Sequence, residues 1–231
     1  NKKSNADQEK CYRYLENKKS INNKNNACNG DNANNINNAN NIIFDYKNYN
    51  NLSTNLLGEH QVHNACVAIE ALDIKKKKGY KVASNDIRDG LVSVHWPARL
   101  QVLKEDNPKI ILDGGHNPQC IDAIVKELKR YKDADIVYVV SIVKDKNADL
   151  MAKELSTVSK KFVLTHIDNK RGMEEKELED IFLRYSDDVT YRYDTKDSIE
   201  YAKEKINNDG IVCIIGSLYF AGDLLKIYKS I

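Results

Sequence analysis

The stretch Ile110-Ile111-Leu112-Asp113-Gly114-Gly115-His116-Asn117-Pro118 decides the fold of this chain. A short apolar β-type run ends on a carboxylate, two glycines turn the chain, and Asn117-Pro118 suits a helix N-cap followed by the first helical position. Apolar residues then recur at helical spacing and predict the buried stripe of that helix: Ile121, Ile124, Val125 and Leu128. Ligands of open α/β sheets bind at such junctions, beyond the carboxyl end of a strand and facing a helix N-terminus. The junction therefore predicts a candidate ligand site at Asp113, although Asp-Gly pairs also form ordinary turns.

Strand-like and helix-like segments alternate on both sides of this junction. We predict strands at residues 100–104, 109–112, 136–143, 161–167, 189–193 and 211–216. We predict helices after Asn117, at 148–158, 174–185 and 198–206, and from about Leu218. Continuous apolar runs such as 136–140 are typical of strands covered on both faces. The pattern predicts an α/β fold with a doubly wound, mostly parallel sheet.

The first 55 residues differ in composition from the rest. About half of the positions between Asn22 and Asn51 are Asn, and such a polar tract cannot bury enough apolar surface to offset its ordering entropy. Short β-type runs at 11–15 and 42–46 flank it, so we expect a disordered, low-complexity insertion between two strands. The alternative, a prion-like interaction tract, is disfavoured because aromatic residues are few there.

A different pattern begins at Gly58. Apolar positions between His63 and Leu72 predict a helix that ends in a lysine run, and a second short helix is predicted at 86–91. Trp96-Pro97 then marks a boundary, because proline restricts itself and the residue before it. We therefore expect two parts, 1–95 and 96–231.

Composition excludes several classes of protein. The 231 residues carry a formal net charge of +2 with a pI of about 8.2, which gives no case for nucleic-acid binding. No apolar run predicts a membrane span or a signal peptide. The five cysteines are scattered without a CxxC pair, which indicates reduced thiols. We expect a cytoplasmic protein, with a mitochondrial form as the alternative, or a chain that lacks its natural N-terminus.

Three further fragments carry side chains that suit ligand chemistry. Asn64, at the start of the first predicted helix, is either a cap or an amide that recognises a purine edge. Arg99 is either a phosphate ligand or a surface arginine beside Trp96. Ser217 is either an N-cap or a hydroxyl presented at the sheet edge. His60 and His63 have a spacing that a metal could use, but no further ligand completes a site.

Together these fragments resemble the C-terminal half of folylpolyglutamate synthase/dihydrofolate synthase, the folate branch of the Mur ligase superfamily. The resemblance extends from about Leu57 to the end, and four ordered motifs carry it: Gly58…His60-Gln61…Asn64-Ala65, Trp96-Pro97-Ala98-Arg99, Asp113-Gly114-Gly115-His116-Asn117-Pro118 and Gly216-Ser217-Leu218-Tyr219. Two departures are visible. Ala98 stands where the family usually has Gly, and Gly115 stands where it often has Ala.

The resemblance implies an ATP-dependent amide ligase. In that family ATP phosphorylates a carboxylate of folate or pteroate, and the amine of L-glutamate attacks the acyl phosphate. The resemblance places Asn64 near adenine, Arg99 on the phosphates, Asp113 on the ribose and His116 beside phosphate or glutamate, so Arg99 and His116 are also the candidate catalytic residues. Ser217 is the candidate contact for glutamate.

The same resemblance implies the arrangement of the parts. The first part is the end of a central ATP-binding domain, and the second is a Rossmann-like C-terminal domain that closes as a lid. We expect a monomer whose partners are small molecules, with no nucleic acid and no membrane.

The phosphate-loop pattern G-x-x-x-x-G-K-[ST] is absent from the sequence. The phosphate loop and the Mg²⁺ ligands that the resemblance implies are therefore expected outside this chain, which we interpret as a C-terminal fragment that is inactive alone. Two alternatives remain. The chain is a non-catalytic Rossmann-like nucleotide-binding or interaction module, or it belongs to another Mur-type amide ligase. The sequence does not distinguish dihydrofolate synthase from folylpolyglutamate synthase.

Overall fold

The computed structural model describes residues 12–17, 41–167 and 170–228, and the chain divides into two compact units that meet between Trp96 and Pro97. This division lies one residue from the boundary expected at Trp96. Within the described ranges, no helix is both long enough and apolar enough to cross a bilayer.

The first unit consists of a three-stranded antiparallel sheet and two helices. The strands lie in the order β1-β2-β3, and the elements are β1 (Tyr12–Asn17), β2 (Ile42–Tyr46), β3 (Tyr49–Thr54), α1 (Glu59–Lys77) and α2 (Ser84–Ser93). Its core joins apolar side chains of β2 and β3 to the inner faces of both helices: Ile42, Phe44, Leu52, Val62, Ile69 and Ile87.

The expectation of disorder across the Asn-rich tract is wrong for residues 41–51. These residues form β2 and the start of β3, whereas residues 22–40 lie outside the described part of the chain. Ile42, Phe44, Tyr46 and Tyr49 are buried and supply the apolar surface that the tract as a whole lacks. The backbone N–H of Asn51 also donates to Oδ1 of Asp45 at 2.8 Å. Local burial and hydrogen bonding therefore outweigh the unfavourable composition here.

The second unit contains a six-stranded mixed sheet in the order β4-β5-β9-β6-β7-β8, with β4 antiparallel to β5 and all other pairs parallel. Its strands are β4 (Gln101–Lys104), β5 (Lys109–Leu112), β6 (Ile136–Val140), β7 (Lys161–Thr165), β8 (Asp188–Arg192) and β9 (Ile211–Ile215). The last strand in the sequence thus lies inside the sheet, where Cys213 pairs with Ile111 on one side and Tyr138 on the other. The predicted α/β fold with a doubly wound, mostly parallel sheet is confirmed.

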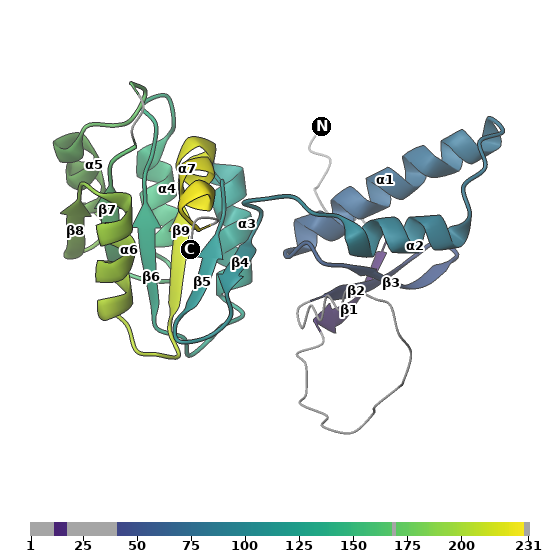
Figure 1. Cartoon of the computed structure of the whole chain (residues 1–231), viewed down its shortest axis with the longest axis horizontal. Helices are drawn as coiled ribbons and strands as arrows, with labels where there is room; N and C mark the ends of the chain where they lie inside the picture. Colours follow the sequence, from purple (N-terminus) through teal and green to yellow (C-terminus); the bar gives the residue numbers. More distant parts are fainter. Residues whose placement is uncertain (1–11, 18–40, 168–169, 229–231) are drawn as a thin grey trace, which may run out of the picture. The chain divides into compact units, whose positions relative to one another are not determined.

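Helices cover both faces of this sheet (Figure 1). They are α3 (Pro118–Leu128), α4 (Ala148–Leu155), α5 (Glu175–Phe182), α6 (Thr195–Glu204) and α7 (Leu218–Tyr228). On one face α3 lies beside α4 and α4 beside α5, whereas α6 and α7 pack on the other. Phe182 of α5 meets the ring of Phe162 at 4.9 Å, and Phe162 stacks on Tyr138. The predicted apolar stripe of α3 is buried, as expected from its spacing.

The strands β6 and β7 end earlier than predicted, at Val140 and Thr165. The apolar residues that follow, such as Ile142 and Ile167, are buried but lie in loops beyond the carboxyl edge of the sheet. The predicted strands were too long because the prediction used apolar residues to set their ends. Apolar residues indicate burial but not strand hydrogen bonding.

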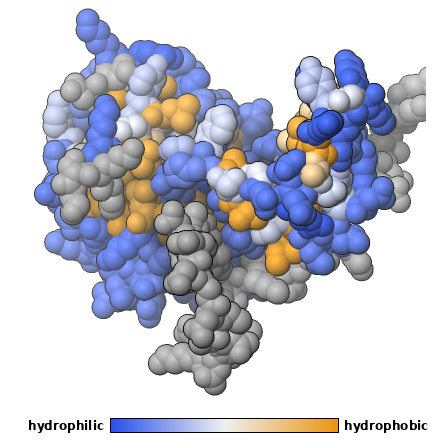
Figure 2. Space-filling model, turned by 45° about the vertical axis from the view of Figure 1, so that its right-hand side comes forward, coloured by the Kyte–Doolittle hydropathy of each residue, from blue (hydrophilic) through white to orange (hydrophobic). Residues whose placement is uncertain are grey.

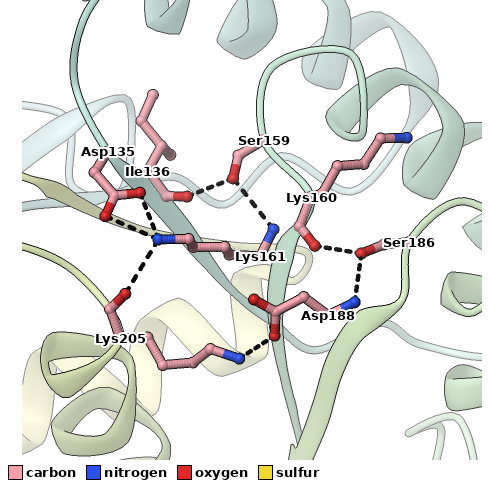
Figure 3. A network of polar contacts seen from close by, with 8 residues as sticks. All are labelled: Asp135, Ile136, Ser159, Lys160, Lys161, Ser186, Asp188 and Lys205. Atoms are coloured by element: carbon pink, nitrogen blue, oxygen red, sulfur yellow. Dashed lines mark hydrogen bonds and ion pairs between the residues drawn. The ribbon is translucent and has the colours of Figure 1, made fainter.

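A polar network ties together the amino ends of β6, β7 and β8, opposite the edge that carries the candidate site (Figure 3). Nζ of Lys161 donates to both carboxylate oxygens of Asp135 at 2.7 and 2.8 Å and to the carbonyl oxygen of Lys205 at 3.2 Å. Lys205 in turn forms an ion pair with Asp188. The network pairs charged side chains, and one backbone carbonyl, at the edge where these strands begin. We interpret it as a stabilising feature.

The face shown in Figure 2 is largely hydrophilic, with scattered apolar patches. On the first unit, the outer side of α1 carries the exposed side chains Val67 and Ile74, which are 57% and 53% exposed.

Candidate functional site

The carboxyl edge of the second sheet gathers the sequence motifs of this unit. Five parallel strands end there, and each is followed by a loop and a helix that begins at the same edge. Asn117 caps α3 as predicted, because its Oδ1 accepts the backbone N–H of Cys120 at 2.9 Å and Pro118 occupies the first helical turn. This is the position at which open α/β sheets bind ligands.

Asp113 follows β5 and is almost fully buried, with 5% of its surface exposed. Its Oδ2 accepts the backbone N–H of Leu100 at 2.7 Å, and its Oδ1 accepts that of Gly115 at 2.6 Å. Burial raises the pKa of the Asp113 carboxyl above its ordinary value, while these two N–H groups and the charge of Arg99 act in the opposite direction. The carboxylate thus joins the glycine turn to the segment that precedes β4.

Arg99 lies in that preceding segment, between two residues of left-handed conformation. Ala98 has φ +55° and Leu100 has φ +44°, a region that favours glycine. This explains in physical terms why glycine would suit the position of Ala98. The carbonyl oxygen of Ala98 accepts the N–H of Gly114 at 2.9 Å, so both neighbours of half-buried Arg99 are bound to the Asp113 turn.

The Gly216-Ser217 turn follows β9, next to β5 in the sheet. Gly216 has φ +120°, and a Cβ at this position would lie 2.4 Å from the carbonyl oxygen of Ser141. Only glycine fits there. Ser217 is buried, and its Oγ accepts the N–H of Tyr219 at 3.2 Å in the first turn of α7. The hydroxyl therefore acts as a helix cap in this structure and keeps its own proton for a further acceptor.

His116 and Ser217 line a common pocket of about 160 Å³. The pocket lies among loops that follow β5, β6, β7 and β9, and its lining is His116, Val143, Lys146, Arg171, Ser217, Leu218 and Tyr219. Nδ1 of His116 lies 2.9 Å from the carbonyl oxygen of Gly114. Since a carbonyl oxygen only accepts, Nδ1 carries the proton and Nε2 is left for acid–base or ligand contacts.

Arg171 is held in this pocket by the loop after β6. Its Nη2 donates to Oδ2 of Asp145 at 2.8 Å, and its Nη1 lies 3.5 Å from the hydroxyl of Tyr219. Hydrogen bonding to Asp145 raises the pKa of Arg171 and lowers that of Asp145. With Lys146 alongside, the pocket offers an excess of positive charge that suits a carboxylate or phosphate group.

Asn64 belongs to the first unit, where it lies on α1. Its Nδ2 donates to Oε1 of Gln61 at 3.1 Å, and its side chain is exposed. It does not cap the helix, which begins at Glu59 after Gly58 with φ 97°. Among the described residues, no cluster of three His, Cys, Asp or Glu side chains could hold a metal ion.

The structure thus brings Arg99, Asp113, His116 and Ser217 to one edge of the second unit. It adds three polar pocket residues for which the sequence analysis predicted no role: Lys146, Arg171 and Tyr219. Lys146 and Arg171 lie in loops after β6 and β7, and their place beyond strand ends was the signal available in the sequence. Tyr219 was visible within its motif.

Comparison with known proteins identifies the family of the domain that carries this edge. The family model described as "Mur ligase, glutamate ligase domain" matches residues 98–218, more than half of the chain. The chain belongs to the Mur ligase family. All the site residues of the second unit named above lie within this Mur ligase domain, except Tyr219, which follows it directly.

Individual relatives agree with the family. The chain is 32% identical over 185 residues to dihydrofolate synthase/folylpolyglutamate synthase of Bacillus subtilis, covering 79% of this chain and 42% of that protein. It is 28% identical over 181 residues to UDP-N-acetylmuramoyl-L-alanyl-D-glutamate–2,6-diaminopimelate ligase of Aquifex aeolicus, covering 76% and 36%.

A solved structure of Mycobacterium tuberculosis folylpolyglutamate synthase complexed with ADP matches with a TM-score of 0.71 and 25% identity, covering 78% of this chain and 42% of that one. This Mur ligase chain therefore spans less than half the length of each of these relatives.

Proposed function

We propose that this chain is the C-terminal portion of an ATP-dependent ligase that joins a carboxylate of folate or pteroate to the amine of L-glutamate. The observation that carries the proposal is the convergence of Arg99, Asp113, His116 and Ser217 at one sheet edge. The folate relatives add weight, because the B. subtilis protein is more similar to this chain than the diaminopimelate ligase is.

The residues of the second unit fit the chemistry of such a ligase. ATP supplies activation of the carboxylate as an acyl phosphate. Arg99 provides a guanidinium for phosphate oxygens, and Asp113 lies where the resemblance places the ribose. Nε2 of His116 would orient phosphate or glutamate. The Ser217 hydroxyl would contact glutamate. Such transfer depends on positioning and positive charge more than on covalent catalysis.

The rest of the ligase is proposed to lie outside this chain. The first unit, with Asn64 on α1 as the candidate adenine contact, would be the end of a central ATP-binding domain, and the phosphate loop and Mg²⁺ ligands would precede it. The second unit would close as a lid that keeps water from the acyl phosphate. We propose a monomeric cytoplasmic enzyme.

The test is a coupled phosphate-release assay on the full-length parent protein, with dihydropteroate or tetrahydrofolate as acceptor and L-glutamate as amine. We expect release that requires both the acceptor and glutamate, and the better acceptor assigns the synthase class. A UDP-N-acetylmuramoyl dipeptide with diaminopimelate serves as the third arm. Release in that arm alone would assign a peptidoglycan ligase, and release in none would indicate a non-catalytic module.

A further inference from the structure

We infer that Asp113 is a positioning residue for Arg99: its carboxylate fixes the left-handed turn that holds Arg99 at the carboxyl edge of the sheet. The inference rests on the proposed function, since it assigns how one residue of that site supports another. It differs from a nucleotide contact at the ribose, because it predicts that Asp113 acts on the reaction through Arg99.

The contacts of Asp113 carry the first step. Each carboxylate oxygen already accepts a short hydrogen bond from a backbone N–H, one from Leu100 and one from Gly115. Bonds from N–H groups to a buried carboxylate are stronger than those between neutral groups. The side chain is also 5% exposed, so its strongest interactions are with the protein itself.

The backbone on either side of Arg99 carries the second step. Ala98 and Leu100 both adopt positive φ without being glycine, a conformation that persists only where surrounding contacts impose it. Three contacts hold the segment here. In one of them the backbone N–H of Ala98 donates to Oε1 of Gln101 at 2.9 Å, and the other two come from the Asp113 turn. Leu100 donates to Asp113, and the carbonyl oxygen of Ala98 accepts from Gly114. Without the carboxylate, the Leu100 N–H loses its acceptor. The two contacts at Ala98 remain, and we expect Leu100 to relax towards negative φ.

The consequence concerns the guanidinium of Arg99. A side chain of four rotatable bonds acts on a transferring phosphoryl group only if its backbone is fixed, because small displacements of a charged group lower the rate steeply. Asp113 is the group that connects β5, whose position the sheet sets, to the backbone at Arg99. It therefore supports the rate without having to touch the reacting atoms.

The experiment is a double-mutant cycle in the full-length parent with Arg99→Ala, Asp113→Asn and both together. We expect Arg99→Ala to lower kcat by about 10- to 100-fold. Asp113→Asn should lower kcat in the wild-type background by about tenfold, yet by less than about twofold when Arg99 is already Ala. Additive losses, or a rise in KM for ATP at unchanged kcat, would overturn the inference and favour an independent nucleotide contact.

A second readout does not depend on activity. Asparagine has a single acceptor oxygen, so hydrogen exchange of the Leu100 or Gly115 amide should accelerate by about tenfold or more in Asp113→Asn. The matched control is Glu127→Gln on α3, a carboxylate with the same 5% exposure that lies outside the site. It should leave both amides and the kcat unchanged. Unchanged exchange in Asp113→Asn would refute the positioning role, whereas a wild-type parent without ligase activity would refute only the proposed function.

Discussion

Replacement of Gly216 by Ala is expected to destabilise the second unit by about 3 kcal/mol. A φ of +120° is available almost only to glycine, and forcing another residue there costs about 1–3 kcal/mol. The new Cβ would lie 2.4 Å from the carbonyl oxygen of Ser141 and 3.0 Å from its carbonyl carbon. These are backbone atoms, so β6 and β9 must separate. Separation weakens the hydrogen bond from the Ser141 N–H to the Ile215 carbonyl oxygen, worth about 1 kcal/mol.

Gly222→Ala is the matched control, six residues further along the chain. A Cβ there meets nothing within 4 Å and φ is not restrictive, so alanine should stabilise α7 by about 0.5–1 kcal/mol. Urea unfolding of the whole chain, followed by far-ultraviolet circular dichroism, should separate the two variants by more than about 1 M in midpoint at unchanged slope. Midpoints that agree to within about 0.3 M would refute the close approach of β6 and β9 at this turn.

Four further outcomes follow from other contacts. Ala98→Val should lower the free energy of unfolding by about 2 kcal/mol, because a β-branched residue resists positive φ. Ala98→Gly should stay within about 1 kcal/mol of wild type, since relieved strain offsets the lost methyl. Equal melting temperatures of the two variants would contradict this prediction. Lys161→Met should cost about 1 kcal/mol through the half-exposed pair with Asp135, and Asp135→Asn added to it should cost little more in urea titrations. Arg171→Met in the parent should raise KM for glutamate about tenfold at nearly constant kcat. Arg184→Met, which breaks an exposed pair with Asp149, should leave both constants unchanged; the reverse pattern would show that Arg171 does not bind glutamate in the pocket. Burial raises the pKa of Asp113 in the folded state. Its contribution to stability should therefore be greatest below the unfolded-state pKa of about 4 and should decline as the pH rises through the folded-state pKa. Asp113→Asn should lack that decline in thermal melts measured across this pH range.

The helices and strands of the second unit could be predicted from the sequence because their local signals agree with one another. The stripe from Ile121 to Leu128, the cap at Asn117 and the apolar strand at 136–140 all predict the same parallel sheet, and the structure contains each of them. The order of the strands was not predictable in this way, since periodicity says nothing about which strands pair. Insertion of β9 between β5 and β6 depends on packing of long-range contacts.

Three residues of the candidate site were predictable because they belong to a glycine turn that follows a strand. Asp113, His116 and Ser217 met that condition. Arg171 also precedes a glycine, but it lies several residues beyond the end of β7, and its place in the pocket depends on Asp145 from a different loop. The two hydrogen bonds accepted by the Asp113 carboxylate were equally unpredictable, since one of them comes from Leu100, in the segment that precedes β4. Composition gave a wrong prediction at residues 41–51, where Ile42, Phe44 and two tyrosines supply the burial that the asparagines do not.

The position of β9 in the middle of the sheet also governs how this domain is made. During synthesis β5 emerges about 100 residues, and β6 about 70 residues, before the strand that separates them, so the inner edges of both strands stay unpaired until β9 has left the ribosome. Exposed strand edges of this kind promote aggregation. A chain that stops before Ile211 would therefore contain two unjoined parts of a sheet and no shortened domain, because β9 alone connects β5 to β6.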